Sequence, residues 1–185
     1  MKNVFYKSTK RVITQELLNS VGLGKAKKKP SLKKHFLGSR KGFSVFDVEK
    51  TIVAYTKALS LVSFFDKLGL KILFLGSPLF LEGSVQGLLA NSKHIFLPGK
   101  SWKPGTFSNR KHFPDLIISF KQAGGFSSKE CLNKNIPLVS FVGETNNLIL
   151  ADFPILVNLK SVGAAKMFFN LIKQLALRNN NFTKH

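Results

Sequence analysis

The chain has 185 residues, of which 44% are hydrophobic, so it is long enough for one domain with a sizeable core. Lysine and arginine number 29 against nine acidic residues, which gives a formal net charge of +20. That surplus argues against a small-substrate enzyme and favours a nucleic acid or an anionic membrane as partner. The apolar runs, such as residues 59–65, are far shorter than the roughly 20 residues of a membrane span, so no membrane partner is expected.

Cysteine and histidine usage argues against a metal or a cofactor. Cys131 is the only cysteine, which excludes an internal disulfide and a multi-cysteine zinc site and suggests a small core residue. The four histidines have no partner histidine at helical spacing. We therefore expect no metal site and no cofactor; the histidines are His35, His94, His112 and His185.

The first 42 residues form a predicted basic N-terminal arm with one short helix at residues 15–21. Its densest stretch, residues 25–41, contains eight cationic residues and no acid. Like charges of this density repel each other in the free chain, so contacts with phosphates would order the stretch. A solvated arm or an import sequence is the alternative interpretation.

The arm leads into residues 43–46, a β-prone run followed by Asp47 as a helix cap. Apolar residues then recur at helical spacing from Val48 to Val62, and Gly69 is the stop signal. An almost wholly apolar strand follows at residues 71–75. The sequence here predicts a β-α-β crossover of right-handed sense.

The remaining elements continue this alternation. We expect helices at residues 81–91, from the capping box at 127–130, and after Ser161, with strands at 95–97, 115–120, 137–142 and, as an edge strand, 154–157. On the last helix, Val162, Ala165, Phe169 and Ile172 share one face. The fold class predicted is α/β, a mostly parallel β-sheet flanked by helices in flavodoxin-like or Rossmann-like layering. One domain spans residues 43–178, and a polar tail follows at 179–185.

The loop at residues 99–112 has no periodicity and mixes cationic residues with aromatic ones. Such a composition suits RNA, because aromatic rings stack on bases and cations meet phosphates. An ordinary surface loop with one buried tryptophan is the alternative. With the arm, it supplies the candidate RNA-binding residues: Lys25, Lys27, Lys28, Lys29, Lys33, Lys34, Arg40, Lys41, Trp102, Lys103, Asn109, Arg110 and Lys111.

Enzymatic function is not expected, and no catalytic residue is assigned. Residues 76–83 are neither a dinucleotide fingerprint nor a phosphate loop, and the serine in residues 83–87 is misplaced for a nucleophile elbow. The acidic residues fall mostly at positions of helix caps and strand ends. No small-molecule substrate is therefore expected.

Several ordered blocks of the chain resemble the ribosomal protein S-two family of the bacterial type. They cover roughly residues 17 to 175 and come in family order; they are Phe36 to Thr51, Lys71 to Gly76, Phe113 to Ile118, Asn135 to Val139, and Glu144-Thr-Asn146 with Asp152-Phe-Pro154. The resemblance implies a non-enzymatic α/β domain of the small ribosomal subunit. Its partners would be small-subunit ribosomal RNA and neighbouring ribosomal proteins, near the junction of head and body.

The chain departs from the family pattern in two places, and the second departure, a shortened segment rich in lysine and aromatic residues, points to an organellar ribosome. Glu144 stands where the family has aspartate, and the tryptophan-leucine-glycine-glycine stretch is altered to residues 102–105. Few residues separate Asn109 from Pro114, so we expect no helical hairpin where the family inserts one. The expected function is that of a structural constituent of the mitochondrial small ribosomal subunit. The alternative is a stand-alone α/β enzyme that binds a nucleotide or sugar phosphate.

Composition adds a hint about origin. Only four of the 29 cationic residues are arginines, and phenylalanine is abundant, as in genes written in AT-rich codons. We therefore expect a protein that is made inside the organelle or keeps its start at Met1.

Overall fold

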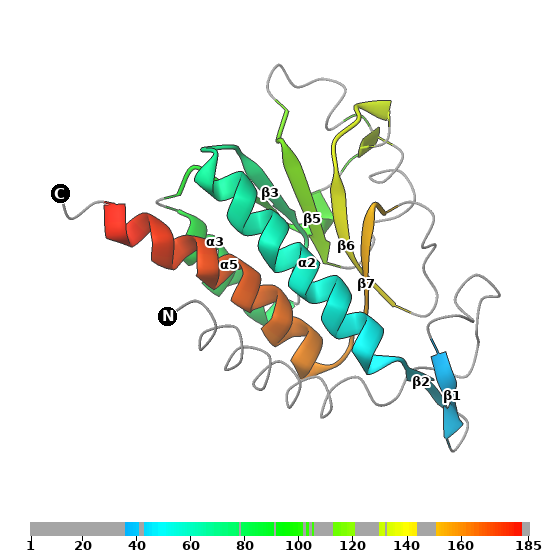
Figure 1. The fold of residues 1–185 in the computed structure, drawn as a ribbon. Helices are drawn as coiled ribbons and strands as arrows, with labels where there is room; N and C mark the ends of the chain where they lie inside the picture. The colour runs from blue at the N-terminus through cyan, green and yellow to red at the C-terminus, as the bar shows by residue number, and fades with distance from the viewer. Residues whose placement is uncertain are drawn as a thin grey trace, which may run out of the picture.

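Five short apolar strands pair in parallel to form the central sheet, in the order β4-β3-β5-β6-β7 (Figure 1). The strands are β3 (Ile72–Leu75), β4 (Ile95–Leu97), β5 (Leu116–Phe120), β6 (Leu138–Val142) and β7 (Phe153–Leu156). This computed structural model describes residues 36–40, 43–77, 79–90, 92–101, 103, 105, 113–120, 130–131, 133–143 and 151–182. The predicted α/β class, the mostly parallel sheet and the edge position of β7 are confirmed.

The sheet is buried on both faces, as expected for strands that read as continuous apolar runs. Every residue of β3, β5 and β6 is buried. On one face, Phe74 and Phe141 pack against Phe168 of the last helix, with ring centroids 6.1 and 5.6 Å away. On the other face, Leu73 and Ile117 belong to a smaller cluster.

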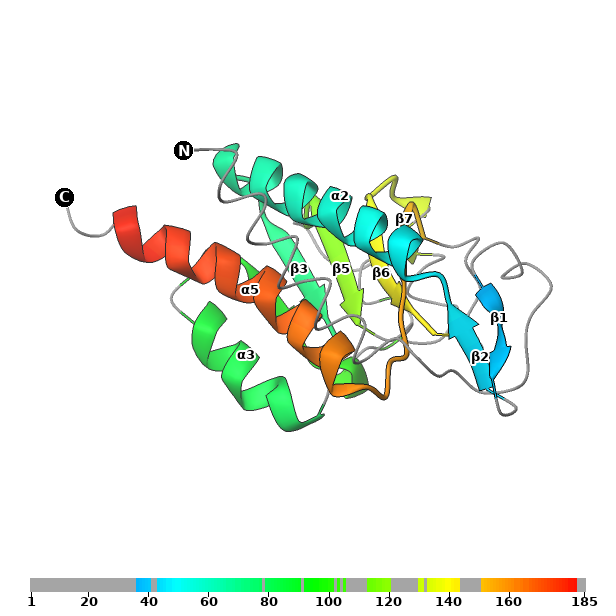
Figure 2. The same cartoon turned by 60° about the horizontal axis from the view of Figure 1, so that its bottom comes forward.

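Three helices cover the first face: α2 (Val48–Lys67), α3 (Glu82–Leu89) and α5 (Val162–Phe182) (Figures 1 and 2). Short 3-10 turns at Leu79–Leu81 and Gly99–Ser101 follow β3 and β4. Asp47 caps α2 as predicted, because its Oδ1 accepts the Lys50 N–H at 3.3 Å. Ser161 Oγ likewise accepts the Ala164 N–H at 3.1 Å. Helix α5 continues to Phe182, four residues into the predicted polar tail.

The inward face of α5 agrees with the predicted one except at its first position. Ala165 and Ile172 are buried and Phe169 packs against the core, whereas Val162 is 62% exposed. The buried face is also wider than predicted, because the neighbouring Phe168 and Leu171 are buried as well.

The prediction that residues 43–46 form the first strand of a β-α-β crossover is wrong. These residues form β2 (Phe43–Phe46), which pairs antiparallel with β1 (Phe36–Arg40) in a separate two-stranded sheet. Only two residues separate the paired Arg40 and Phe43, which is the connection of a β-hairpin. The Phe46 ring stacks on Phe36 of β1, with ring centroids 4.8 Å apart. Phe46 is also fully buried in the main core, and this burial holds the hairpin to the domain.

Several predictions fall on residues outside the described ranges. They are the helix at 15–21, the turn at 124–125, the first three residues of the capping box at 127–130, and the absence of a hairpin within residues 106–112. Glu130, Cys131 and Asn133 are helical, in agreement with the helix expected there.

Candidate nucleic-acid interface

The structure describes little of the predicted RNA-binding set. The side chain of Lys103 is exposed, and Arg40 is the last residue of β1, although its side chain is not described. The others lie outside the described residues: Lys25, Lys27, Lys28, Lys29, Lys33, Lys34, Lys41, Trp102, Asn109, Arg110 and Lys111. Whether these residues form one surface therefore stays a prediction.

The strand order places the topological switch point between β3 and β5, where α/β proteins of this layering bind ligands. At this point Gly76 has φ +71, and a Cβ placed on it would lie 2.8 Å from the Phe120 carbonyl oxygen. The glycine therefore permits close approach of the two strand ends. Glycine at this position fits chain packing, and its sequence context supplies no phosphate loop.

The signature at residues 48–51 makes structural contacts. Thr51 is 3% exposed, and its hydroxyl donates to the Leu156 carbonyl at 2.8 Å. The Asp47 carbonyl oxygen lies 3.1 Å from the same hydroxyl. One turn further on, the Tyr55 hydroxyl donates to the Met167 carbonyl at 2.9 Å. These two bonds join α2 to the edge strand β7 and to α5.

Two aspartates, each just before a strand, make the same pair of hydrogen bonds to the start of the neighbouring strand. The Asp115 carboxylate accepts the Lys71 N–H at 2.8 Å, while the Asp115 N–H donates to the Lys71 carbonyl at 2.9 Å. The Asp152 carboxylate accepts the Leu138 N–H at 2.8 Å, and its N–H donates to the Leu138 carbonyl at 3.1 Å. The proline-aspartate and aspartate-phenylalanine-proline motifs therefore fix strand register.

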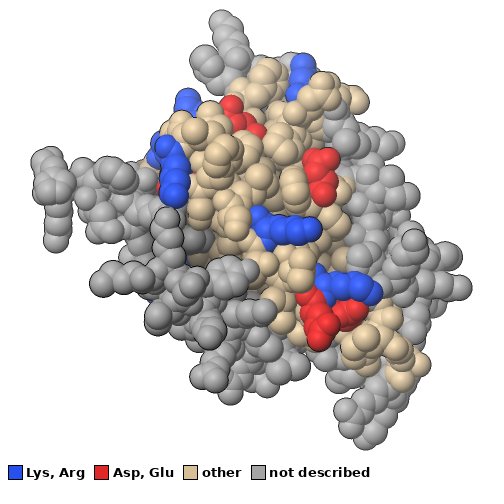
Figure 3. Space-filling view, in the orientation of Figure 1, with Lys and Arg blue, Asp and Glu red and all other residues tan. Residues whose placement is uncertain are grey.

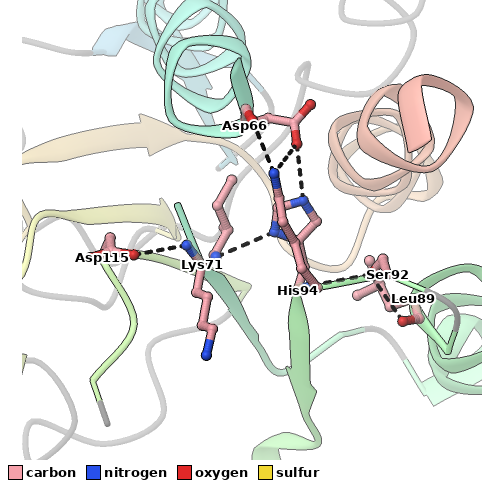
Figure 4. Close-up of polar contacts among 8 residues, drawn as sticks. Asp66, Lys71, Leu89, Ser92, His94 and Asp115 are labelled. Atoms are coloured by element: carbon pink, nitrogen blue, oxygen red, sulfur yellow. Dashed lines mark hydrogen bonds and ion pairs between the residues drawn. The ribbon is translucent and has the colours of Figure 1, made fainter. Parts of the chain in front are cut away.

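A buried polar cluster joins the end of α2 to the start of β3 and β4 (Figure 4). His94 Nδ1 accepts the Ile72 N–H at 3.3 Å, which leaves the proton of the neutral ring on Nε2. Nε2 lies 3.4 Å from Asp66 Oδ1, at ion-pair distance without hydrogen-bond alignment, and Lys93 Nζ lies 3.0 Å from the same oxygen. Burial lowers the pKa of His94, and the charge of Asp66 opposes that shift.

A hollow of about 430 Å³ lies between α2 and the edge strand β7. Three of the chain's nine acidic residues line it, Asp47, Glu49 and Asp152, together with Lys50 and Lys57. Lys50 Nζ pairs with Asp47 Oδ2 at 2.9 Å, and the hydrogen bond from this side chain lowers the pKa of Asp47. Phosphate would be repelled by these carboxylates, so the hollow is a poor RNA site.

The described cationic and anionic side chains are scattered over the face shown in Figure 3, and those that are described form no continuous basic patch on this face. Within the described ranges, no three His, Cys, Asp or Glu side chains are placed to hold a metal. No described helix combines the length and apolarity needed to cross a bilayer. Cys131 is buried in the smaller core cluster, as predicted for a small core residue, and this burial raises the pKa of its thiol to about 12.

Sequence reasoning missed the cluster of His94, Asp66 and Lys93, because these residues come from different elements and no local motif links them. It also missed that Thr51 bonds across the fold to a residue 105 positions away. A polar residue within an otherwise inward helical stripe was the available signal for Thr51.

Fold and contacts together define an α/β protein of flavodoxin-like layering whose motif residues hold elements together. The sequence model of the family described as Ribosomal protein S2, the S-two family named above, matches residues 19–124, more than half of the chain. The chain belongs to this ribosomal protein family. The small ribosomal subunit protein uS2 of Sphingopyxis alaskensis is 26% identical over an alignment of 113 residues, and the alignment covers 57% of this chain and 40% of that relative. The matched part thus spans well under half of the relative's length.

Proposed function

We propose that the protein is a structural, RNA-binding constituent of the mitochondrial small ribosomal subunit. The family match carries the proposal: residues 19–124 include both lysine-rich candidate segments, 25–41 and 99–112. The relative's name places that protein in the small ribosomal subunit. A net charge of +20 supplies the electrostatic attraction that binding to a phosphate backbone requires.

Mitochondrial origin rests on composition and on the shortened segment between Asn109 and Pro114. Fractionation of cells from the source organism tests it, with the protein detected by mass spectrometry. We expect the protein in the mitochondrial matrix, in a large particle whose sedimentation collapses after ribonuclease treatment. A free monomer or dimer in the cytosol would overturn both the location and the ribosomal role. The same spectra test whether the mature protein retains Met1 or lacks only that residue.

The arm is the proposed main source of RNA affinity. If roughly six of the cations in residues 25–41 met phosphates, the plot of log K against log salt would have a slope of about −4 to −5. Replacing five of these lysines by alanine should flatten that slope without unfolding the domain. The five are Lys27, Lys28, Lys29, Lys33 and Lys34. An unchanged slope in this variant would contradict the role of the arm and make the loop at residues 99–112 the proposed main RNA contact.

The competing function is a stand-alone enzyme that binds a nucleotide or sugar phosphate, and the strand order is what favours it. Against it, no strand-end loop in the sequence has the glycine pattern that presents backbone amides to a phosphate. Titration calorimetry with common nucleotides should therefore show no saturable binding. Saturable micromolar binding of a nucleotide would favour the enzyme.

A further inference from the structure

Helix α5 presents one line of exposed side chains away from the core. Val162, Lys166, Asn170 and Lys173 are exposed and recur at spacings of four, four and three residues, so they lie on one side of the helix. Lys160 is also exposed and stands two residues before the helix begins. We call Lys160, Lys166 and Lys173 the α5 lysine row.

The row has no counter-charge among the described residues. No described acid pairs with any of its three lysines, and the sequence of α5 contains no Asp or Glu. Most acids of the domain serve elsewhere, as caps, register bonds and the hollow beside β7. The row is therefore a local concentration of uncompensated positive charge.

The end of the row nearest the start of α5 runs against helix electrostatics. Acids are favoured in the first turn of a helix and cations in the last turn. Helix α2 follows this rule with Glu49 and Lys67. Helix α5 has no acid in its first turn, and the exposed Lys160 stands two residues before that turn, whereas Lys166 and Lys173 lie beyond it. A cation at this end without an acid inside the fold fits a negatively charged partner outside it.

We propose that the α5 lysine row binds phosphates of the ribosomal RNA; this inference rests on the proposed function. Lys166 and Lys173 are two turns apart, about 10.5 Å along the helix axis. That separation is several times the axial spacing between successive phosphates of one strand, which is about 3.4 Å in B-form DNA and shorter in A-form RNA, so the two ammonium groups can reach different phosphates. Asn170 between them supplies an amide that can bond to phosphate or sugar oxygens.

An acidic protein is the other possible partner, and the composition of the row disfavours it. The centres of protein interfaces are enriched in aromatic residues, methionine and arginine and depleted in lysine. The exposed line on α5 has two lysines, an asparagine and one valine. Lysine and asparagine are residue types that contact nucleic-acid backbones.

An amine-reactivity footprint of the native particle tests the contact. The particle is treated with an acetylating reagent before and after ribonuclease digestion, and modified lysines are quantified by mass spectrometry. We expect the row to become several-fold more reactive after digestion, whereas the exposed Lys57, Lys67 and Lys71, which serve as controls, should change little. Row lysines that are equally reactive in both samples would overturn the inference. Protection that survives digestion would assign the row to a protein partner and overturn it too.

A matched pair of triple variants of the full chain tests the energetics. Lys160→Gln/Lys166→Gln/Lys173→Gln and Lys57→Gln/Lys67→Gln/Lys71→Gln remove the same charge, and glutamine is well tolerated in helices. With labelled duplex RNA, the row variant should lose about 2–3 units of the log K against log salt slope, at about 0.7–0.9 per phosphate contact, and the control variant much less. Equal losses of slope in both variants would refute the assignment of phosphate contacts to the α5 lysine row, while RNA binding by the chain would still stand. A wild-type chain without salt-dependent binding would refute the proposed function itself. Circular dichroism of both variants checks that the fold is retained.

Discussion

Replacing Thr51 by valine removes one buried hydroxyl while keeping side-chain volume and β-branching nearly constant. The Thr51 hydroxyl lies 2.8 Å from the Leu156 carbonyl and is the bond that joins the start of α2 to β7. Valine and threonine have similar helix propensities, so the change acts through this bond. Leaving a buried acceptor without its donor costs about 1–3 kcal/mol of unfolding free energy.

The measurement is urea unfolding and thermal melting of the full chain, followed by circular dichroism. A loss of about 2 kcal/mol corresponds to a decrease in Tm of roughly 4–8 °C for a chain of this size. Thr56→Val is the matched control on the same helix, because the Thr56 hydroxyl donates only to the neighbouring Ile52 and Val53 carbonyls. We expect its cost to stay below about 0.5 kcal/mol. Equal destabilisation by the two variants would refute the role assigned to the Thr51 bond.

Three further predictions concern His94, the two aspartates at the strand starts, and Cys131. The pKa of His94 is lowered in the folded state, so the unfolded chain binds the proton first as pH falls below about 6.5, and the free energy of unfolding should decrease towards about pH 5.5. Urea midpoints measured across this pH range should show the decrease. His94→Asn keeps an acceptor for the Ile72 N–H and should make the midpoints less dependent on pH. Asp115→Ala and Asp152→Ala should each lower the free energy of unfolding by about 0.5–1.5 kcal/mol, since each removes an acceptor from a backbone N–H at a strand start while both carboxylates remain open to solvent. A cost below that of an exposed Glu49→Ala control would contradict the register role. The Cys131 thiol of the native chain should resist a disulfide reagent at about pH 8, because the pKa of the thiol is raised to about 12. The thiol should react once urea unfolds the chain. Rapid reaction in the native chain would contradict the burial of Cys131.

Strand and helix positions were predictable because they depend on local patterns. Strands buried on both faces read as short apolar runs, and Asp47 and Gly69 marked the two ends of α2. The hairpin was not predictable in the same way. Residues 43–46 are equally apolar whether they pair in the main sheet or with β1, and Gly38 and Ser39 dilute the strand pattern of their true partner.

The candidate interface was predictable only as composition. Clusters of lysine in residues 25–41 indicate a phosphate-binding segment without saying which side chains meet the same surface. The α5 lysine row shows the same limit, because its one-sided exposure depends on how α5 is turned against the sheet. Packing of Phe168 and Leu171 in the core fixes that rotation.

The bond from Tyr55 to the Met167 carbonyl sets an order of events while the protein is being made. Its two ends are 112 residues apart. At roughly 5–20 residues per second, a translating ribosome takes roughly 6–22 s to synthesise that interval. Until α5 has been made, α2 and the sheet face around Phe74 lack the helix that packs against them. The domain can therefore close only after α5 has emerged, so the nascent chain exposes apolar surface over that interval.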